Sequence, residues 1–234
     1  MTREHALTKP LKTTKRSCAL ALVAILAITA SAPFAYAADY YAGWQESNYQ
    51  YGVQSIMKPT EEASQTNSLI NSHVSSDEET ANWIQAGWYD SSLYAGGDCN
   101  QTSGAMIRYI EIHIDVRYCY QLGSVSSGTE YTYQVYRGSS CGTDKYYWYA
   151  YIGASGYYAC LNFGSSRHFA QLESKDLSNT AESKFRELKH YGTGFSWSYW
   201  DGSYSVHCNA TSYFTTNKTS NTEFNAKDGS GSCQ

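Results

Sequence analysis

The sequence predicts an all-β fold, a two-sheet antiparallel sandwich of the jelly-roll type with few or no helices. Tyrosine is the most unusual residue type, with 23 copies in 234 residues, and it is enriched in strands. Many short segments alternate apolar and polar residues, and clusters of Gly, Ser, Asn and Asp separate them. No internal repeat is evident, which argues against a propeller.

The first 37 residues have the pattern of a secretory signal peptide. Five Lys or Arg precede or adjoin an apolar run from Cys18 to Ala30, and Ala35-Tyr36-Ala37 resembles a cleavage site. The run is shorter than the roughly 20 residues that a membrane-spanning helix needs. The sequence therefore predicts a secreted protein whose residues 38–234 form one domain.

The charge of the exported part is acidic. After residue 37 the chain keeps 12 Lys and Arg against 20 Asp and Glu, and the basic residues form no cluster. This balance argues against nucleic acid and anionic membrane surfaces as partners. We expect a monomer that acts on an extended peptide or a glycan.

Six cysteines follow the signal peptide, and an even number in an exported chain predicts three disulfides. Six cysteines allow 15 pairings, of which proximity along the chain favours one set. These favoured pairs are Cys99–Cys119, Cys141–Cys160 and Cys208–Cys233. No C-x-x-C or H-x-x-x-H spacing occurs, so we expect neither a metal site nor another cofactor.

The expected strands follow from period-2 alternation and from the turn residues between them. Residues 38–50 read as an N-terminal arm or a first edge strand. The clearest strand is 107–116, where Ile110, Ile112 and Ile114 alternate with Tyr109, Glu111 and His113. The segment 180–190 contains helix formers but also alternates, and the β-rich context favours a strand. Further strands are expected at 51–57, 68–74, 83–89, 129–137, 168–173 and near 212–216, with hairpins formed by 145–152 with 157–163 and by 195–200 with 204–208 around the turn Asp201-Gly202.

The segment 83–89 combines a strand pattern, aromatic side chains and an amide. By period 2, Trp83, Gln85 and Gly87 share one face, while a second set shares the other. That second set, Ile84, Ala86 and Trp88, is apolar and is expected to be buried. Gln85 should then face a cleft beside Trp83, and Gly87 should leave room for a ligand.

Other candidate chemistry finds less support. The sequence has no G-x-S-x-G motif for a serine nucleophile, and paired cysteines leave no thiol. His113 lies between Glu111 and Asp115 on a polar strand face, which permits a metal or acid–base role. An exposed or hydrogen-bonded strand histidine is the expectation there.

The segment Trp83-Ile84-Gln85-Ala86-Gly87-Trp88 resembles a strand of the neprosin-like group of exported β-sandwich proteins, in which Trp or Ile precedes Gln-x-Gly-Trp. The segment 51–56 resembles the short G-V-x-A-x-I strand that opens those domains. Ala181-Glu182-Ser183, followed by Phe185 and Trp197, resembles the second acidic strand of the glutamic peptidases.

The resemblance implies an acid-acting endopeptidase of the glutamic type, with Gln85 and Glu182 as its catalytic dyad and Trp83 and Gly87 beside the substrate. A carboxylate can accept a proton from the attacking water, and an amide N–H can donate to the developing oxyanion. In the plant branch the dyad is two glutamates, and the sequence does not decide which of Glu111, Glu173, Glu182 or Glu187 would be the second.

The aromatic residues support an alternative function. Trp197, Tyr199, Trp200 and Tyr204 flank the turn Asp201-Gly202, and further tyrosines crowd the 145–152 segment. Exposed Trp and Tyr rings beside Asp and Asn suit sugars, so a non-catalytic module for glycans or cell-wall polymers would use Trp197 and Trp200. The third hypothesis is a structural protein that is stabilised by disulfides and binds no ligand.

Overall fold

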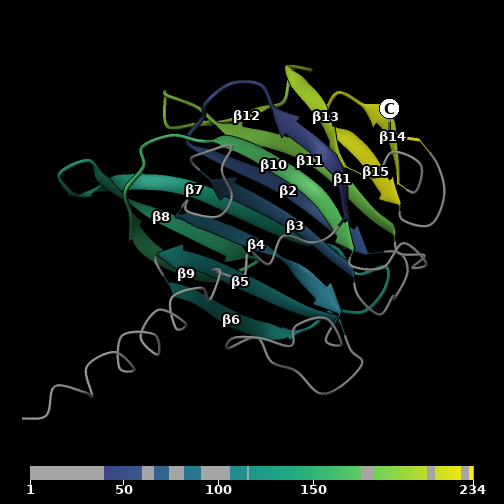
Figure 1. Cartoon of the computed structure of the whole chain (residues 1–234), viewed down its shortest axis with the longest axis horizontal. Coiled ribbons are helices and arrows are strands. Elements are labelled where there is room, and N and C mark those ends of the chain that lie inside the picture. Colours follow the sequence, from purple (N-terminus) through teal and green to yellow (C-terminus); the bar gives the residue numbers. More distant parts are fainter. Residues whose placement is uncertain are drawn as a thin grey trace, which may run out of the picture. The chain divides into compact units, whose positions relative to one another are not determined.

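Two antiparallel β-sheets pack against each other in the computed structural model, which describes residues 40–59, 66–73, 82–90, 106–114, 116–174, 182–209, 214–227 and 232–233 (Figure 1). The predicted signal peptide lies outside these residues. No helix occurs in the described part of the chain. The prediction of an all-β sandwich is therefore confirmed.

The first sheet has seven strands in the order β13-β1-β10-β3-β4-β5-β6. Its strands are β13 (Tyr204–Cys208), β1 (Tyr40–Glu46), β10 (Arg167–Ser174), β3 (Thr66–His73), β4 (Trp83–Asp90), β5 (Met106–Ile114) and β6 (Val116–Ser124). We call it the seven-stranded sheet. Strand β4 lies in the interior of this sheet, with β3 on one side and β5 on the other.

The second sheet has eight strands, seven of them in the order β14-β15-β11-β2-β7-β8-β9, with β12 paired to β11. Its strands are β14 (Thr215–Ser220), β15 (Glu223–Lys227), β11 (Glu182–Tyr191), β2 (Gly52–Pro59), β7 (Tyr131–Gly142), β8 (Lys145–Ile152), β9 (Ser155–Leu161) and β12 (Trp197–Tyr199). We call it the eight-stranded sheet.

The core lies between the two sheets and receives every second residue of strands such as β4, β7 and β8. Ile84, Ala86 and Trp88 of β4 are fully buried in it, opposite Trp148 and Ala150 of β8. This alternation is what a strand with one face on a core and one face outward requires. The same alternation, read along each strand, identifies which side chains point away from the core.

Three expectations differ from the structure. The 195–200 and 204–208 segments do not form a hairpin, because β12 pairs with β11 in one sheet and β13 pairs with β1 in the other. The chain changes sheets at Trp200, which is only 3% exposed and belongs to the core. Strands β6 and β15 were not expected, and β1 lies between two strands rather than at an edge.

Two of the three expected disulfides are present in the described residues. Cys141–Cys160 joins β7 to β9, and Cys208–Cys233 joins the end of β13 to the C-terminal segment. Cys119 of β6 is also disulfide-bonded. Its expected partner, Cys99, lies outside the described residues.

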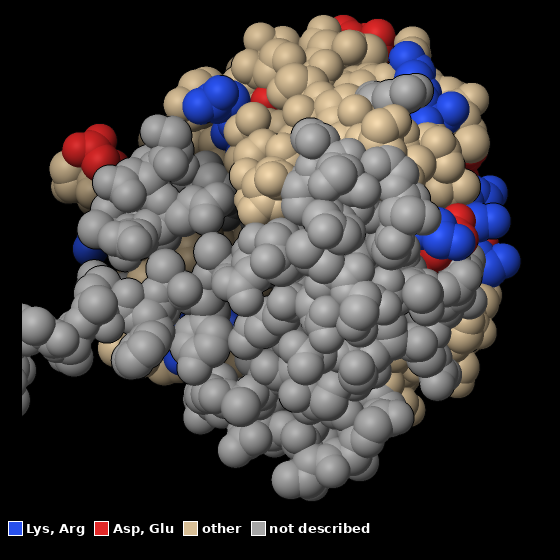
Figure 2. Space-filling model, turned by 45° about the vertical axis from the view of Figure 1, so that its right-hand side comes forward, with Lys and Arg blue, Asp and Glu red and all other residues tan. Residues whose placement is uncertain are grey.

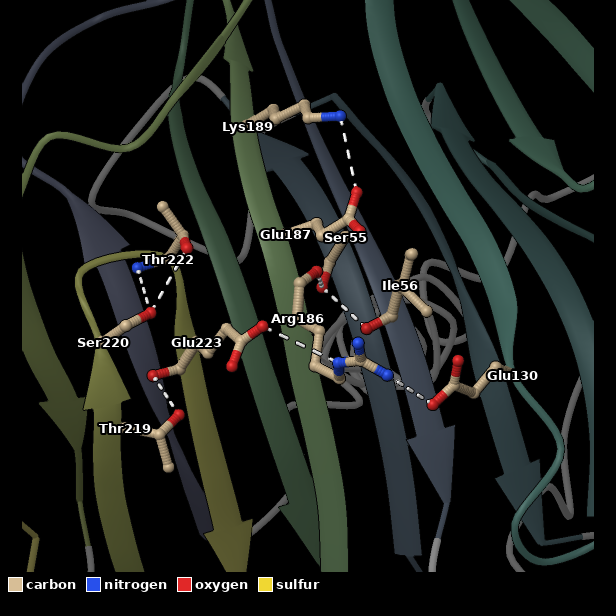
Figure 3. A network of polar contacts seen from close by, with 10 residues as sticks. All are labelled: Ser55, Ile56, Glu130, Arg186, Glu187, Lys189, Thr219, Ser220, Thr222 and Glu223. Atoms are coloured by element: carbon tan, nitrogen blue, oxygen red, sulfur yellow. Dashed lines mark hydrogen bonds and ion pairs between the residues drawn. The ribbon is translucent and has the colours of Figure 1, made fainter.

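A polar network covers part of the outward face of the eight-stranded sheet (Figure 3). The Arg186 guanidinium donates from Nη1 to Glu130 Oε1 at 2.8 Å, and its Nε lies 3.7 Å from Glu223 Oε1. The register between β11 and β2 shifts just after Arg186, and Glu187 there has a φ of 51°. The Ser55 hydroxyl donates to the Arg186 carbonyl at 3.0 Å, which satisfies a backbone group at this bulge.

Charged side chains are sparse among the described atoms on the face that Figure 2 shows. In Figure 2 most of the described atoms belong to uncharged residues, and Lys and Arg form small separate groups. Among the described residues, none forms a helix that is long and apolar enough to cross a membrane.

Candidate functional site

The strand β4 places Gln85 on the outward face of the seven-stranded sheet. Its neighbours Ile84 and Ala86 are fully buried in the core, so Gln85 points the opposite way, as predicted. Gln85 is nonetheless only 7% exposed, and its amide contacts Tyr109 and Glu111 of β5. The strand therefore presents a largely desolvated amide.

Gln85 lies directly opposite Glu111 of β5 in the strand register. Its Nε2 donates to Glu111 Oε2 at 2.9 Å and to the Tyr109 hydroxyl at 3.0 Å. An amide nitrogen has two N–H groups, so both are used. The pair thus joins a carboxylate and an amide across two adjacent strands without an intervening water.

Arg117 of β6 completes a three-strand arrangement. Its Nε forms an ion pair with the second carboxylate oxygen, Oε1 of Glu111. Glu111 is fully buried, whereas Arg117 is 19% exposed. A guanidinium and an amide N–H are the donors that an ionised carboxylate accepts, so the buried charge of Glu111 is compensated.

Aromatic rings flank this group on both sides along the strands. Trp83 stacks on His113 with ring centroids 5.6 Å apart, and the Arg117 guanidinium lies 6.0 Å from the Trp83 ring. At the other side, Tyr89 meets Tyr109 edge to face at 5.1 Å. We call Gln85, Glu111 and Arg117 with these flanking rings the β4–β5–β6 site.

Tyr89 is fully buried and accepts a hydrogen bond from Gln121 Nε2 at 2.8 Å. Burial raises the pKa of Tyr89 to about 12, although the bond from Gln121 opposes the shift. Its phenol therefore stays protonated at acid and neutral pH. Together with Ile107, Tyr109 and Cys119 it forms a small apolar cluster on the outward face, separate from the main core.

The structure does not bring Gln85 and Glu182 together. Glu182 is the first residue of β11 in the eight-stranded sheet, where it pairs with Lys227 of β15 and is half-buried. Gln85 lies in the other sheet, so no sheet face is common to both. The carboxylate that the structure places beside Gln85 is Glu111.

The remaining residues predicted from sequence divide between the two sheets. Trp83 and Gly87 lie with Gln85 on β4, and Gly87 pairs with Tyr109. Trp197 lies on β12 at the outward face of the eight-stranded sheet, half-buried. Trp200 is a core residue and cannot serve as an exposed sugar platform.

The sequence already contained a signal for Glu111, which is on the polar face of the clearest predicted strand. Arg117 had none, because that strand ends at Ile114 and the next begins at Val116. A second amide–carboxylate pair was also missed. Gln171 Nε2 donates to Glu173 Oε1 at 2.6 Å on the outward face of β10.

That second pair is too far away to join the first. Through the strand register, Glu173 aligns with Tyr89, which is four residues along β4 from Gln85. Strand β10, which carries Glu173, is two strands away from β4. Strand spacing and rise put the Gln85 backbone roughly 12 Å from that of Gln171 and roughly 16 Å from that of Glu173. The two pairs are thus separate groups on one outward face.

A titratable pair connects the two sheets at another position. His190 Nδ1 of β11 lies 3.0 Å from Glu46 Oε1 of β1. Burial raises the pKa of Glu46, and the hydrogen bond with Glu46 raises the pKa of His190. Asp201 adds a negative charge nearby, and the backbone N–H of Ser203 lowers the pKa of Asp201. This pair lies three strands from β4 and forms no part of the β4–β5–β6 site.

No group of three His, Cys, Asp or Glu side chains suited to a metal ion occurs within the described ranges. The β4–β5–β6 site itself offers a carboxylate, an amide and a guanidinium. A carboxylate can move a proton, and amide and guanidinium N–H groups can stabilise a developing oxyanion.

Comparison with solved structures identifies the fold as that of the glutamic peptidases. Scytalido-glutamic peptidase, solved with a transition-state analogue inhibitor, superposes with a TM-score of 0.51 at 9% identity, covering 81% of this chain and 97% of that one. The same peptidase with a peptide-based analogue gives 0.49 at 13% identity, covering 81% and 98%. SCP-B, a member of the eqolisin family of peptidases in complex with the tripeptide Ala-Ile-His, gives 0.46 at 12% identity with the same coverage.

No family model matches the sequence, and no curated protein matches it. At these identities the likeness to solved structures shows the fold alone. The predicted glutamic-peptidase-like β-sandwich is confirmed as a fold.

Proposed function

We propose that this chain is an acid-acting endopeptidase whose β4–β5–β6 site cleaves extended peptides. One observation carries the proposal, namely that Gln85 Nε2 lies 2.9 Å from Glu111 Oε2 on the outward face of the seven-stranded sheet. When water attacks a peptide carbonyl, a carboxylate can accept the proton of the water and an amide N–H can stabilise the oxyanion. The fold is one in which peptidases of that class occur.

In the proposed reaction, Glu111 accepts a proton from water as the water oxygen bonds to the scissile carbonyl carbon. The carbonyl π electrons move to oxygen, and N–H groups of Gln85 and Arg117 donate to that oxyanion. Glu111 then returns the proton to the amine nitrogen as the C–N bond breaks. The substrate oxygen takes the place of the Tyr109 hydroxyl as a partner of the Gln85 amide.

The substrate-contact residues in this proposal are Trp83 and Gly87, on the same strand as Gln85. An extended peptide lying across β4 would meet the Trp83 ring on one side of Gln85 and the side-chain-free Gly87 on the other. The Trp83–His113 stack holds the indole in place at 5.6 Å.

The test is digestion of a denatured protein at about pH 3 to 5, around the ordinary glutamate pKa of about 4.3. We expect Glu111→Gln to lose at least about 100-fold in rate, the low end for removal of a general acid–base group. Glu182→Gln is the matched control, because it is a glutamate on the other sheet and should cleave as wild type does. Equal loss in both variants, or equal activity of Glu111→Gln and wild type, would overturn the assignment.

We also propose that the chain acts outside the cytosol after removal of residues 1–37. Two disulfides within the described residues are typical of an oxidising compartment. N-terminal sequencing of the protein recovered from the culture medium should begin at Ala38. Recovery of the full-length chain from the cytosol alone would contradict this proposal.

A further inference from the structure

The outward face of the eight-stranded sheet carries a continuous row of aromatic rings. The strand register aligns Tyr158 of β9 with Tyr149 of β8, and Tyr149 with Tyr136 of β7. On the far side of Gly52, Tyr191 of β11 pairs with Trp197 of β12. We call Tyr136, Tyr149, Tyr158, Tyr191 and Trp197 the aromatic strip.

Neighbouring rings of the aromatic strip are in contact across the strands. The centroid distances are 5.7 Å for Tyr149–Tyr158, 5.4 Å for Tyr136–Tyr149, 5.5 Å for Tyr136–Tyr191 and 5.0 Å for Tyr191–Trp197. The row crosses the six strands β9-β8-β7-β2-β11-β12, and the four centroid distances limit its length to at most about 22 Å. This length suits an extended polymer better than a single small molecule.

These rings point away from the core. On β7, Tyr133 and Val135 are fully buried in the core, and on β8 so are Trp148 and Ala150. Tyr136 and Tyr149, being adjacent in sequence to core residues, therefore point outward. Tyr158 is 64% exposed, so the end of the aromatic strip at β9 is open to solvent.

Glycines beneath the strip let the rings lie against the sheet. A Cβ on Gly52 would come 2.5 Å from Tyr136 Cβ, and one on Gly138 would come 2.5 Å from Tyr149 Cε2. Gly156 is related in the same way to Tyr151, a tyrosine beside the strip, at 2.3 Å from Cδ1. The ring planes are not parallel along the strip: they differ by 24° between Tyr136 and Tyr149 and by 62° between Tyr136 and Tyr191.

A row of amides runs beside the aromatic strip. Gln134 and Gln54 are opposite each other in the β7–β2 register, and Gln134 Nε2 donates to Gln54 Oε1 at 2.7 Å. The next residue in that row is Lys189, whose ammonium lies 3.6 Å from Glu187 Oε2 and whose charge is thus compensated. The strip itself contains no charged side chain.

We infer that the aromatic strip binds an uncharged polysaccharide in extended form. The flat C–H faces of pyranose rings stack on aromatic faces, and sugar hydroxyls pair with tyrosine hydroxyls and amides, which the strip and its neighbours provide together. A neutral surface matches a neutral polymer, whereas a nucleic acid would require the basic groups that the strip lacks. This site is distinct from the β4–β5–β6 site, because it lies on the other sheet.

The test is native affinity electrophoresis of the full chain in gels that contain soluble xyloglucan or mixed-linkage β-glucan, with polygalacturonate as the anionic comparison. We expect retardation in the neutral polymers that is insensitive to added NaCl, because no ion pair contributes. Tyr149→Ala combined with Tyr158→Ala should weaken binding at least about tenfold, as expected when two contact rings are removed. Tyr149→Phe should retain most of it, since the ring face remains.

Tyr49→Ala is the matched control, because Tyr49 is 56% exposed but lies outside the aromatic strip. It should bind as wild type does. Tyr158→Ala alone serves where the double variant fails to fold, since an exposed ring contributes little to stability.

Three outcomes would overturn the inference: wild type that ignores all the neutral polymers, a double variant that binds unchanged, or concentration-dependent dimerisation that only the double variant abolishes. The last would identify a second copy of this chain as the occupant. Glu111→Gln should bind polysaccharide as wild type does. The binding experiment therefore tests the aromatic strip even if the peptidase assignment is wrong.

Discussion

The disulfide Cys208–Cys233 should contribute about 3.5 kcal/mol to the free energy of unfolding. Its cysteines are separated by 25 residues, and the chain-entropy relation gives that value for a loop of this length at 25 °C. The bond also has a defined structural role. Cys208 ends β13 in the seven-stranded sheet, and Cys233 pairs with Thr216 of β14 in the eight-stranded sheet, so the bond joins the two sheets.

The assay is urea unfolding of the double variant Cys208→Ser/Cys233→Ser against wild type. The same loss should lower the melting temperature by roughly 7 to 14 °C for a domain of this size. The control is Cys141→Ser/Cys160→Ser, whose 19-residue separation predicts about 3.2 kcal/mol within a single sheet. The two double variants should therefore be destabilised almost equally.

Either of two results would refute this reasoning. A loss below about 1 kcal/mol for Cys208→Ser/Cys233→Ser would mean that the unfolded chain is already compact around these positions. A loss more than about 2 kcal/mol larger than that of the control would mean that the bond holds the sheets together through native contacts. In that case loop-closure entropy would not be its main effect.

Two further predictions concern stability. Because the pKa values of Glu46 and His190 are both raised in the fold, the folded state holds more protons than the unfolded state, and stability falls as pH rises from about 4.5 through the raised values. The positive charge of His190 stabilises the fold fully below the ordinary histidine pKa of about 6.5. Thermal melts should therefore show a larger loss of stability for His190→Gln at pH 5 than at pH 8. A larger loss at pH 8 would contradict the pairing of His190 with Glu46. Trp148→Ala should lose about 3 to 5 kcal/mol in urea unfolding, because the side chain is fully buried and donates from Nε1 to the Phe163 carbonyl at 2.9 Å. Trp148→Phe should lose clearly less, and equal losses would show that the cavity does not determine the cost.

The strands could be predicted because one face of each is buried. Residues 109–114 and 131–136 alternate strictly, and a one-residue shift would turn the apolar set toward water. The expected strand 107–116, however, ends at Ile114, and Val116 begins β6. The same rule predicted the orientation of Gln85, with Ile84 and Ala86 on the buried side. Local alternation therefore predicts which way a side chain points with good accuracy.

The sequence could not predict which strands share a sheet. Gln85 and Glu182 both lie on strands, as expected, but long-range pairing assigns those strands to different sheets. The turn Asp201-Gly202 illustrates the same limit. Asp-Gly between aromatic segments is typical of a hairpin, yet burial of Trp200 carries the chain from β12 in one sheet to β13 in the other. A core contact outweighs the local turn signal there.

The two proposed sites can operate at the same time because they lie on opposite sides of the sandwich. The β4–β5–β6 site and the aromatic strip each point away from the common core, so a polysaccharide on the strip leaves the Gln85–Glu111 pair uncovered. Binding on one sheet and cleavage on the other are then independent, and their free-energy effects should add. A chain with Glu111→Gln, Tyr149→Ala and Tyr158→Ala should show each defect at the size found separately. A larger combined defect would mean that a change in one sheet affects the other through the core. The packing of Trp88 against β8 would then be the contact that couples them.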